Sequence, residues 1–401
     1  MRQGWKTVRL GEVCVIDKTK HKNGELPYVG MEDIISGTGK FVGSREPKKV
    51  GSSTFYFTPE HLLYGRLRPY LNKVLLPDFE GHCSSEIFPL LPEVRLDKSF
   101  LFYWITSEKV VKEINRTCTG ARMPRANVNE LLKLDIPLPT VFEQKRIVTI
   151  LDEAFAGIDT AITNTEKNLA NARELFESYL NLVFTKRGDG WIDQRFGEIC
   201  SFVRGPFGGS LKKSCFVEEG FAVYEQQHAI NDQFESVRYF IDDKKFQEMR
   251  RFELFPGDLI MSCSGTMGRV AIVPSTIKRG VINQALLKLT PSDKIDAQYL
   301  RLWMESDSFI EEIEKHSQGA AIKNVSSVKV LKEIEVPIPD LSKQKEIVSK
   351  ILDYREQTNQ LGSIYQKKLN SLKELKQSLL QKAFSGELTA KPDKLMDENV
   401  A

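Results

Sequence analysis

Hydrophobic and polar positions follow two different patterns along the chain. Residues 1 to about 140 contain short apolar runs, among them Tyr28-Val29, Leu62-Leu63-Tyr64, Val74-Leu75-Leu76 and Ile87-Phe88-Pro89-Leu90, separated by Gly, Pro, Asn and Ser. Runs of this length between turn-forming residues are typical of strands. A longer stretch from Lys98 to about Arg116 predicts a helix. We therefore expect a mixed α/β lobe with more strand than helix.

From Ile147 the apolar side chains recur in steps of three and four residues, which is the spacing of a coiled-coil seam. The first seam runs through Ile147, Leu151, Ala154, Ile158, Ile162, Thr165, Leu169, Ala172, Phe176, Leu180 and Val183. A second runs through Ile347, Ile351, Tyr354, Thr358, Leu361, Tyr365, Leu369, Leu372, Leu379 and Ala383. Each predicted helix has about 40 residues, or roughly 60 Å at 1.5 Å per residue.

Both patterns occur twice, in the same order. The matching segments include Trp104 and Trp303, Ile136-Pro137-Leu138-Pro139 and Val336-Pro337-Ile338-Pro339, Gln144-Lys145 and Gln344-Lys345, and Leu151-Asp152 and Leu352-Asp353. A repeat of roughly 200 residues is far longer than that of a solenoid. The predicted fold class is α+β, with two mixed α/β lobes separated by two long antiparallel coiled-coil helices and an internal pseudo-twofold duplication.

The proline pairs mark the change from lobe to helix, because proline fits neither a strand ladder nor a helix interior. The expected borders are a first lobe at 1–140, a central helix at 141–187, a second lobe at 188–340, a C-terminal helix at 341–390 and a tail at 391–401.

Composition excludes several classes of protein. Of the 401 residues 41% are hydrophobic, which is ample for packed cores, and the net charge of +3 argues only weakly for nucleic acid. The six cysteines form no C-x-x-C pair, so a zinc or redox motif is not expected. No signal-like apolar core and no run of about 20 apolar residues is present. We expect a soluble cytoplasmic protein.

Motifs for catalysis and cofactor binding are missing. Gly37-Thr38-Gly39-Lys40 resembles the end of a phosphate-binding loop, but Ile34 replaces the first glycine and Phe41 the Ser/Thr. The five histidines lack the spacing of metal ligands. We predict no catalytic residue, no metal site and no bound cofactor.

Candidate contacts to nucleic acid lie in both lobes. Arginine suits guanine, Gln and Asn suit adenine, and Lys suits phosphate. Gln226-Gln227 is the strongest candidate, because it follows the strand-like run Phe221–Tyr224 after a single residue, Glu225. The candidates are Lys20, Arg66, Arg68, Tyr70, Lys73, Arg122 and Arg125 in the first lobe, and Arg204, Lys212, Gln226, Gln227, His228, Ser264, Thr266, Arg269, Lys323 and Asn324 in the second.

Corresponding loops of the two lobes differ in chemistry, since Gly65-Arg66-Leu67-Arg68-Pro69-Tyr70 stands opposite Ser262-Cys263-Ser264-Gly265-Thr266-Met267. Two heads with one frame and different loops are expected to bind two different things. The apolar stripe of the helices is also wider than a two-helix contact needs, which favours partner helices over simple pairing of the two. The candidate partner contacts are Phe155, Leu175, Tyr179, Phe184, Tyr354 and Tyr365.

The whole chain resembles the DNA-specificity subunits of type I restriction-modification systems. The resemblance rests on the duplicated order of Leu10-Gly11-Glu12, Cys83-Ser84-Ser85-Glu86, Phe255-Pro256-Gly257-Asp258-Leu259-Ile260, both proline segments and both Gln-Lys helix starts. Lys343-Gln344 departs from the usual Glu-Gln seen at Glu143-Gln144, which we expect to alter a helix-start contact and not the fold. Pro59-Glu60-His61 departs from Pro256-Gly257-Asp258.

The resemblance implies that each lobe is a target-recognition domain reading one half of a bipartite DNA site. It implies that the paired helices set the unread spacer and dock two methyltransferase subunits. S-adenosylmethionine, ATP and magnesium would be bound by those subunits and by the restriction/translocase subunits. The chain itself would catalyse nothing. The alternatives are a coiled-coil protein-interaction adaptor, a single-chain methyltransferase or nuclease, and a specificity chain of a related restriction system.

Overall fold

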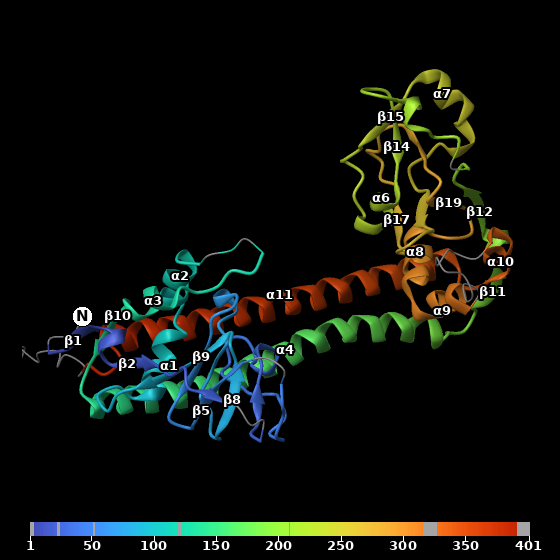
Figure 1. Cartoon of the computed structure of the whole chain (residues 1–401). Helices are drawn as coiled ribbons and strands as arrows, with labels where there is room; N and C mark the ends of the chain where they lie inside the picture. The colour runs from blue at the N-terminus through green and yellow to red at the C-terminus, as the bar shows by residue number, and fades with distance from the viewer. Residues whose placement is uncertain are drawn as a thin grey trace, which may run out of the picture. The chain divides into compact units, whose positions relative to one another are not determined.

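The computed structural model describes residues 4–21, 25–50, 53–118, 120, 122–207, 209–315 and 327–390. The chain divides by compactness into two units, Met1–Glu166 with Gln366–Ala401 (unit 1) and Lys167–Tyr365 (unit 2). This division cuts both long helices, because each lobe packs on a portion of α4 (Val141–Thr185) and of α11 (Leu341–Ser385). Figure 1 labels the elements along the chain.

Unit 1 contains a two-stranded ribbon and two four-stranded sheets, in the orders β1-β10, β2-β9-β6-β7 and β3-β5-β8-β4. The four strand segments expected from the sequence are all confirmed, as β4, β6, β7 and β9. The strands are β1 (Lys6–Arg9), β2 (Cys14–Ile16), β3 (Lys20–His21), β4 (Tyr28–Val29), β5 (Thr54–Phe57), β6 (Leu62–Gly65), β7 (Val74–Leu75), β8 (Gly81–Ser84), β9 (Ile87–Pro92) and β10 (Asp135–Leu138).

Three helices cover the sheet β2-β9-β6-β7: α1 (Lys98–Ile105), α2 (Glu108–Arg116) and α3 (Val128–Leu132). The Asp97 carboxylate caps α1 by accepting from the backbone of Ser99 and Phe100. The prediction of one helix from Lys98 to Arg116 is wrong, because Ser107 adopts an extended backbone and separates α1 from α2.

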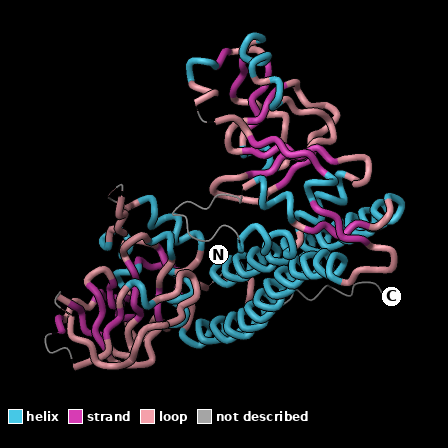
Figure 2. Tube along the Cα trace, turned by 90° about the vertical axis from the view of Figure 1, so that its right-hand side faces the viewer, coloured by secondary structure: helices cyan, strands magenta, loops and turns pink. Residues whose placement is uncertain are grey.

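Unit 2 repeats this plan with β11 (Ile192–Arg195), β12 (Cys200–Arg204), β13 (Phe216–Val217), β14 (Phe221–Tyr224), β15 (Tyr239–Ile241), β16 (Leu259–Ser262), β17 (Val270–Ile272), β18 (Gly280–Ile282), β19 (Leu286–Pro291) and β20 (Glu335–Ile338). The helices of its lobe are α5 (Phe196–Ile199), α6 (Gln226–Asn231), α7 (Asp243–Glu248), α8 (Ala297–Glu305), α9 (Asp307–Lys315) and α10 (Val328–Glu333). Strands and short helices alternate in the lobes, as Figure 2 shows.

The two lobes share one sheet and differ in the other. The order β12-β19-β16-β17 matches β2-β9-β6-β7. In the remaining sheet, β5 pairs with β8, and β4 lies outside β8, whereas β15 pairs with β14, and β18 lies outside β14. The last two strands have therefore exchanged places, so the duplication keeps the frame next to the helices more closely than the outer sheet.

The long helices pair antiparallel within each unit. In unit 2, the Arg355 guanidinium lies 4.6 Å from the Phe176 ring, while Gly362 faces Leu169, so the sequence of one helix runs against that of the other. In unit 1, Lys376 bonds to Asp159. Every seam position predicted from the sequence is buried or half-buried, which confirms both seams.

One detail of the expected repeat is wrong. The sequence comparison matched Leu151-Asp152 with Leu352-Asp353, but Leu151 and Ile351 are both fully buried, and Leu352 is exposed. The helical period therefore makes Ile351 the counterpart of Leu151. Among the described residues, no helix is long and apolar enough to span a bilayer.

Candidate nucleic-acid interface

In unit 2, three segments converge beyond the ends of β12 and β16, which flank β19 in one sheet, and of β14, which belongs to the other sheet. Arg204 ends β12, Cys263–Gly268 follow β16, and α6 follows β14, as expected for Gln226 and Gln227. The Arg204 side chain lies beside the Cys263 thiol, whose pKa burial raises to about 11 while Arg204 opposes the rise. The Gln226 amide lies 3.9 Å from the point where a Cβ on Gly265 would stand. The structure thus brings Arg204 and Gln226 to the Ser264–Thr266 loop.

The loop after β16 is held in shape by a buried hydroxyl. The Ser262 Oγ donates to the Thr266 carbonyl at 2.6 Å and accepts from the Arg269 backbone N–H at 3.0 Å. Gly265 and Gly268 have φ angles of 67° and 75°, a region that glycine adopts without strain. A fixed loop presents the Ser264 and Thr266 side chains to a ligand with little entropy left to lose.

His228 does not belong to this surface, contrary to the sequence prediction. Its ring is buried, with Nδ1 accepting from the Glu225 backbone N–H at 2.8 Å and Nε2 bonded to the Ser236 carbonyl at 3.0 Å. Both nitrogens are therefore occupied in fixing α6. Lys212 lies beside the other sheet of the lobe, next to Leu211, which packs on β14, β15 and β18. Lys323 and Asn324 lie outside the described residues.

In unit 1, the corresponding loop after β6 carries arginines. Arg125 makes a forked pair with the Glu86 carboxylate at 2.8 and 3.0 Å, and Arg66 approaches the same carboxylate at 3.3 Å. Backbone bonds join the two segments, from Arg68 to the Pro124 carbonyl at 2.7 Å and from Ala126 to the Arg66 carbonyl at 2.8 Å. Glu86 thus sets the spacing of Arg66 and Arg125, a role that the sequence reading missed because it sought only basic and amide groups.

The other candidates of unit 1 divide into exposed and occupied side chains. Arg68 and Tyr70 are exposed on the same loop, and Arg122 is exposed on the segment paired with it. The Lys73 ammonium instead donates to the Met31 carbonyl at 2.6 Å, which ties the end of the loop to the lobe. Lys20 lies opposite Phe55 in the outer sheet, so the structure does not bring it to the loop.

Four of the predicted partner contacts on the helices lie in packing between elements of the chain. Phe184 is buried against Tyr299, and Phe155 packs on Tyr103. The Tyr179 and Tyr354 rings lie 4.5 Å apart between the two helices. Tyr365 is half-buried, and Leu175 is exposed. The helices also expose apolar side chains that the sequence reading did not select, namely Phe142, Leu182, Leu341, Leu352, Ile364 and Leu375.

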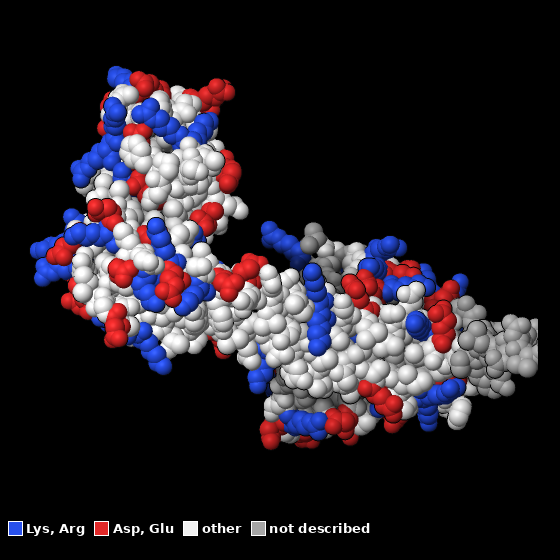
Figure 3. Space-filling model, turned by 180° about the vertical axis from the view of Figure 1, so that it is seen from behind, with Lys and Arg blue, Asp and Glu red and all other residues white. Residues whose placement is uncertain are grey.

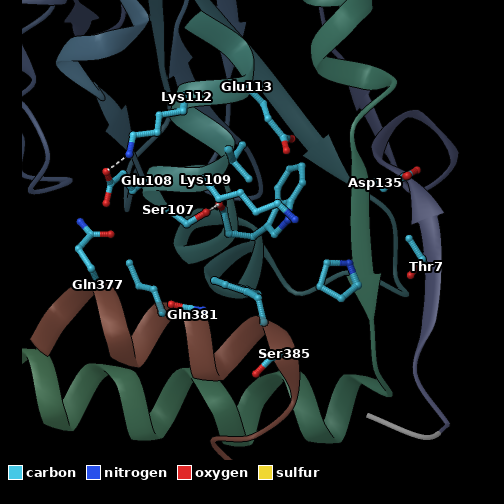
Figure 4. Close-up of a pocket in the computed structure, with 15 residues that line it drawn as sticks. Thr7, Ser107, Glu108, Lys109, Lys112, Glu113, Asp135, Gln377, Gln381 and Ser385 are labelled. Atoms are coloured by element: carbon cyan, nitrogen blue, oxygen red, sulfur yellow. Dashed lines mark hydrogen bonds and ion pairs between the residues drawn. The ribbon is translucent and has the colours of Figure 1, made fainter. Parts of the chain in front are cut away.

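A cavity of about 770 Å³ lies in unit 1 between α2, the end of α11 and the β1-β10 ribbon (Figure 4). Ser107 lines the cavity at the N-terminus of α2, and its hydroxyl donates to the Trp104 carbonyl at 2.6 Å. Next to it, Glu108 pairs with Lys112. Ser107 and Glu108 are thus both engaged in contacts at the end of α1 and the start of α2. Within the described ranges, no cluster of three or more His, Cys, Asp or Glu is placed to hold a metal ion.

Basic and acidic side chains are mixed on the face of the molecule that Figure 3 shows. They alternate over each unit in Figure 3, in keeping with the net charge of +3.

Comparison with known proteins shows the family. The type I restriction modification DNA specificity domain matches the chain twice, at residues 2–171 and 188–374. Among curated proteins, the EcoBI specificity subunit of Escherichia coli is 23% identical over 100% of this chain and 84% of its own length. The EcoDI specificity subunit of Escherichia coli is 27% identical over 45% of this chain, and the match spans only 41% of that subunit.

Solved structures share the fold. A chain from a study of complex assembly and conformational transition of the type I R-M system has a TM-score of 0.84 at 24% identity, covering 97% of this chain and 99% of that one. The HsdS subunit from Thermoanaerobacter tengcongensis has a TM-score of 0.64 at 23% identity, covering 97% and 98%. With two matched domains spanning most of its length, the chain belongs to the type I restriction-modification DNA-specificity family.

Proposed function

We propose that each lobe reads one half of a bipartite DNA target. The observation that carries this proposal is the pair of loops after β6 and β16, which occupy the same place in the same sheet but carry different side chains. Arg66, Arg68 and Arg125 suit guanine edges and phosphates, whereas Gln226 suits an adenine edge. One frame with two loop chemistries matches a target with two unlike halves.

Basic side chains next to the loops supply affinity. Arg122 in unit 1 and Arg269 in unit 2 are exposed beside the base-reading groups. Contacts of such residues with phosphates release counterions, so binding is expected to weaken steeply as salt rises.

The long helices set the distance between the half-sites and dock two methyltransferase subunits. Each helix has 45 residues, or about 68 Å at 1.5 Å per residue. Half-sites read from one face of DNA lie roughly 34 Å apart, which a strut of this length spans. The apolar side chains that the helices expose, including Leu175 and Ile364, are the surface for partner helices.

In this proposal, catalysis is carried out by the partner subunits. The chain contributes recognition and no catalytic residue, while the methyltransferase and restriction/translocase subunits bind S-adenosylmethionine, ATP and magnesium. Such a complex acts on DNA in the cytoplasm. The related curated proteins are named as subunits of restriction enzymes, which supports this division of labour.

Exchanging residues 191–340 for the second lobe of another family member tests independent reading. The methylated target of the complex should change in one half only. Loss of both halves, or a change in the half read by the untouched first lobe, contradicts it. Binding that ignores both sequence and salt would favour the protein-interaction adaptor instead.

A further inference from the structure

Phe207 presents its ring almost wholly to solvent, with 93% of the residue exposed. It lies in the segment Arg204-Gly205-Pro206-Phe207 that continues β12. Single exposed apolar residues are common on protein surfaces, so exposure alone assigns no role. A role for this ring depends on how the backbone holds it and on which residues lie near it.

The backbone before Phe207 is held firmly. Gly205 donates to the Leu286 carbonyl at 2.9 Å, and a Cβ at this glycine would stand 1.9 Å from the Asn283 carbonyl oxygen. Pro206 is buried. The Phe207 carbonyl accepts from the Ser210 backbone N–H at 2.8 Å. The ring of Phe207 is thus exposed although the backbone around it is held by hydrogen bonds and close packing.

The segment lies among the base-reading groups of unit 2. Arg204 contacts the Cys263 thiol, and the Cys263 backbone donates to the Ala285 carbonyl, next to the residues that hold Gly205. Ser264 and Thr266 follow Cys263 in the chain, and the Gln226 amide lies 3.9 Å from the Cβ position of Gly265 between them. In unit 1, the position that corresponds to Phe207, counted from Cys14 as the counterpart of Cys200, is His21, which lies in β3 and stacks on the His82 ring at 4.6 Å.

We infer that Phe207 is a specificity-determining residue of the second lobe, which places its ring against the bases of the second half-site. This inference rests on the proposed function. Aromatic and other apolar side chains contact thymine methyl groups or enter base steps, and neither interaction involves the phosphates. Phe207 therefore adds apolar base contact to the hydrogen bonding of Gln226, Ser264 and Thr266.

The test compares wild type and Phe207→Ala, each in the complete complex with its methyltransferase subunits, on a target duplex and on one with a scrambled second half-site. Phe207→Ala should weaken binding to the target about ten-fold and leave binding to the scrambled duplex unchanged. The dependence of log K on log salt should not change, because the ring carries no charge. Phe207→Trp should retain discrimination, and its fluorescence should become shielded from quencher on the target.

Phe255→Ala is the matched control, since Phe255 is 54% exposed in the same lobe but precedes the opposite end of β16. It should bind both duplexes as wild type does. If wild type discriminates between the duplexes and Phe207→Ala matches it, or loses affinity for both equally, the assignment of Phe207 is wrong and the proposed function stands. If wild type does not discriminate, the proposed function fails and the assignment with it.

Discussion

The side chains of Gln144 and Gln344 make the same three hydrogen bonds, each in the first turn of its own long helix. Gln144 accepts from the Asp97 N–H at 2.8 Å and donates to the carbonyls of Arg95 and Pro139, both at 2.9 Å. Gln344 accepts from Asp296 at 2.8 Å and donates to Lys294 and Pro339 at 3.0 and 2.9 Å. Each glutamine joins the start of α1 or α8, the proline segment and a long helix.

Gln144→Ala and Gln344→Ala should each destabilise the protein by roughly 2–4 kcal/mol, because three buried backbone groups lose their partner. Chemical denaturation measures the change in the free energy of unfolding. Gln360→Ala is the control, since Gln360 is exposed on α11 and its side chain donates to the Glu356 carboxylate one turn away. If Gln344→Ala and Gln360→Ala unfolded at the same denaturant concentration, the three hydrogen bonds of Gln344 would not contribute to stability.

Glu86→Gln should loosen the sequence discrimination of the first lobe. The Glu86 carboxylate holds Arg66 and Arg125 and raises the pKa of the Arg125 guanidinium, which stays charged. Released arginines reach phosphates, so unrelated DNA should bind more tightly and the salt slope should steepen by about one to two. Glu93→Gln, which makes the same charge change beside Arg95, controls for net charge. Identical salt slopes in Glu86→Gln and Glu93→Gln would contradict the role given to Glu86.

Leu175→Ser and Ile364→Ser should weaken assembly with the methyltransferase subunits. Leu175 is 47% and Ile364 60% exposed on the helices, so the melting temperature should change little while affinity for the partner falls about ten-fold or more. Val94→Ser removes an exposed apolar group outside the helices and serves as the control. Undiminished copurification of both helix variants would move the docking surface elsewhere.

The cysteines should react in two classes. Burial raises the pKa of Cys14 to about 12 and that of Cys263 to about 11, and it also raises the pKa of Cys83 and Cys200. Since the thiolate reacts, these four should resist a disulfide reagent at pH 8, while the half-exposed Cys118 and Cys215 react, Cys118 the more slowly because partial burial raises its pKa. After unfolding in guanidinium, all six thiols should react with the reagent. More than two rapid thiols in the folded protein would contradict the described burial.

The sequence predicts the frame well because the frame is periodic and repeated. Steps of three and four residues identify both seams down to individual positions such as Thr165 and Thr358, which are buried. The helix-start difference at Glu143 and Lys343 also follows expectation, since Glu143 bonds to Thr389 whereas Lys343 pairs with Glu346 at 2.8 Å, and both helices form. A departure at His61 is likewise absorbed: His61 accepts from the Thr58 N–H at 3.0 Å as Asp258 accepts from Phe255 at 2.9 Å.

The site is predicted less well because residue type does not report orientation. His228 and Phe184 have suitable chemistry for DNA and for a partner helix, but the fold turns both inward. Glu86 and Phe207 have chemistry that a search for basic and amide groups passes over. The side-chain packing that decides between these cases depends on contacts between segments far apart in the sequence.

The most direct measurement is single-molecule methylome sequencing of a host that expresses this chain with its neighbouring methyltransferase subunit, compared with a host lacking only this chain. The account predicts a new bipartite methylated motif with a fixed gap, present only when the chain is present. A methylated motif that persists without the chain, or a new motif with no gap, would contradict the reading of two half-sites by two lobes.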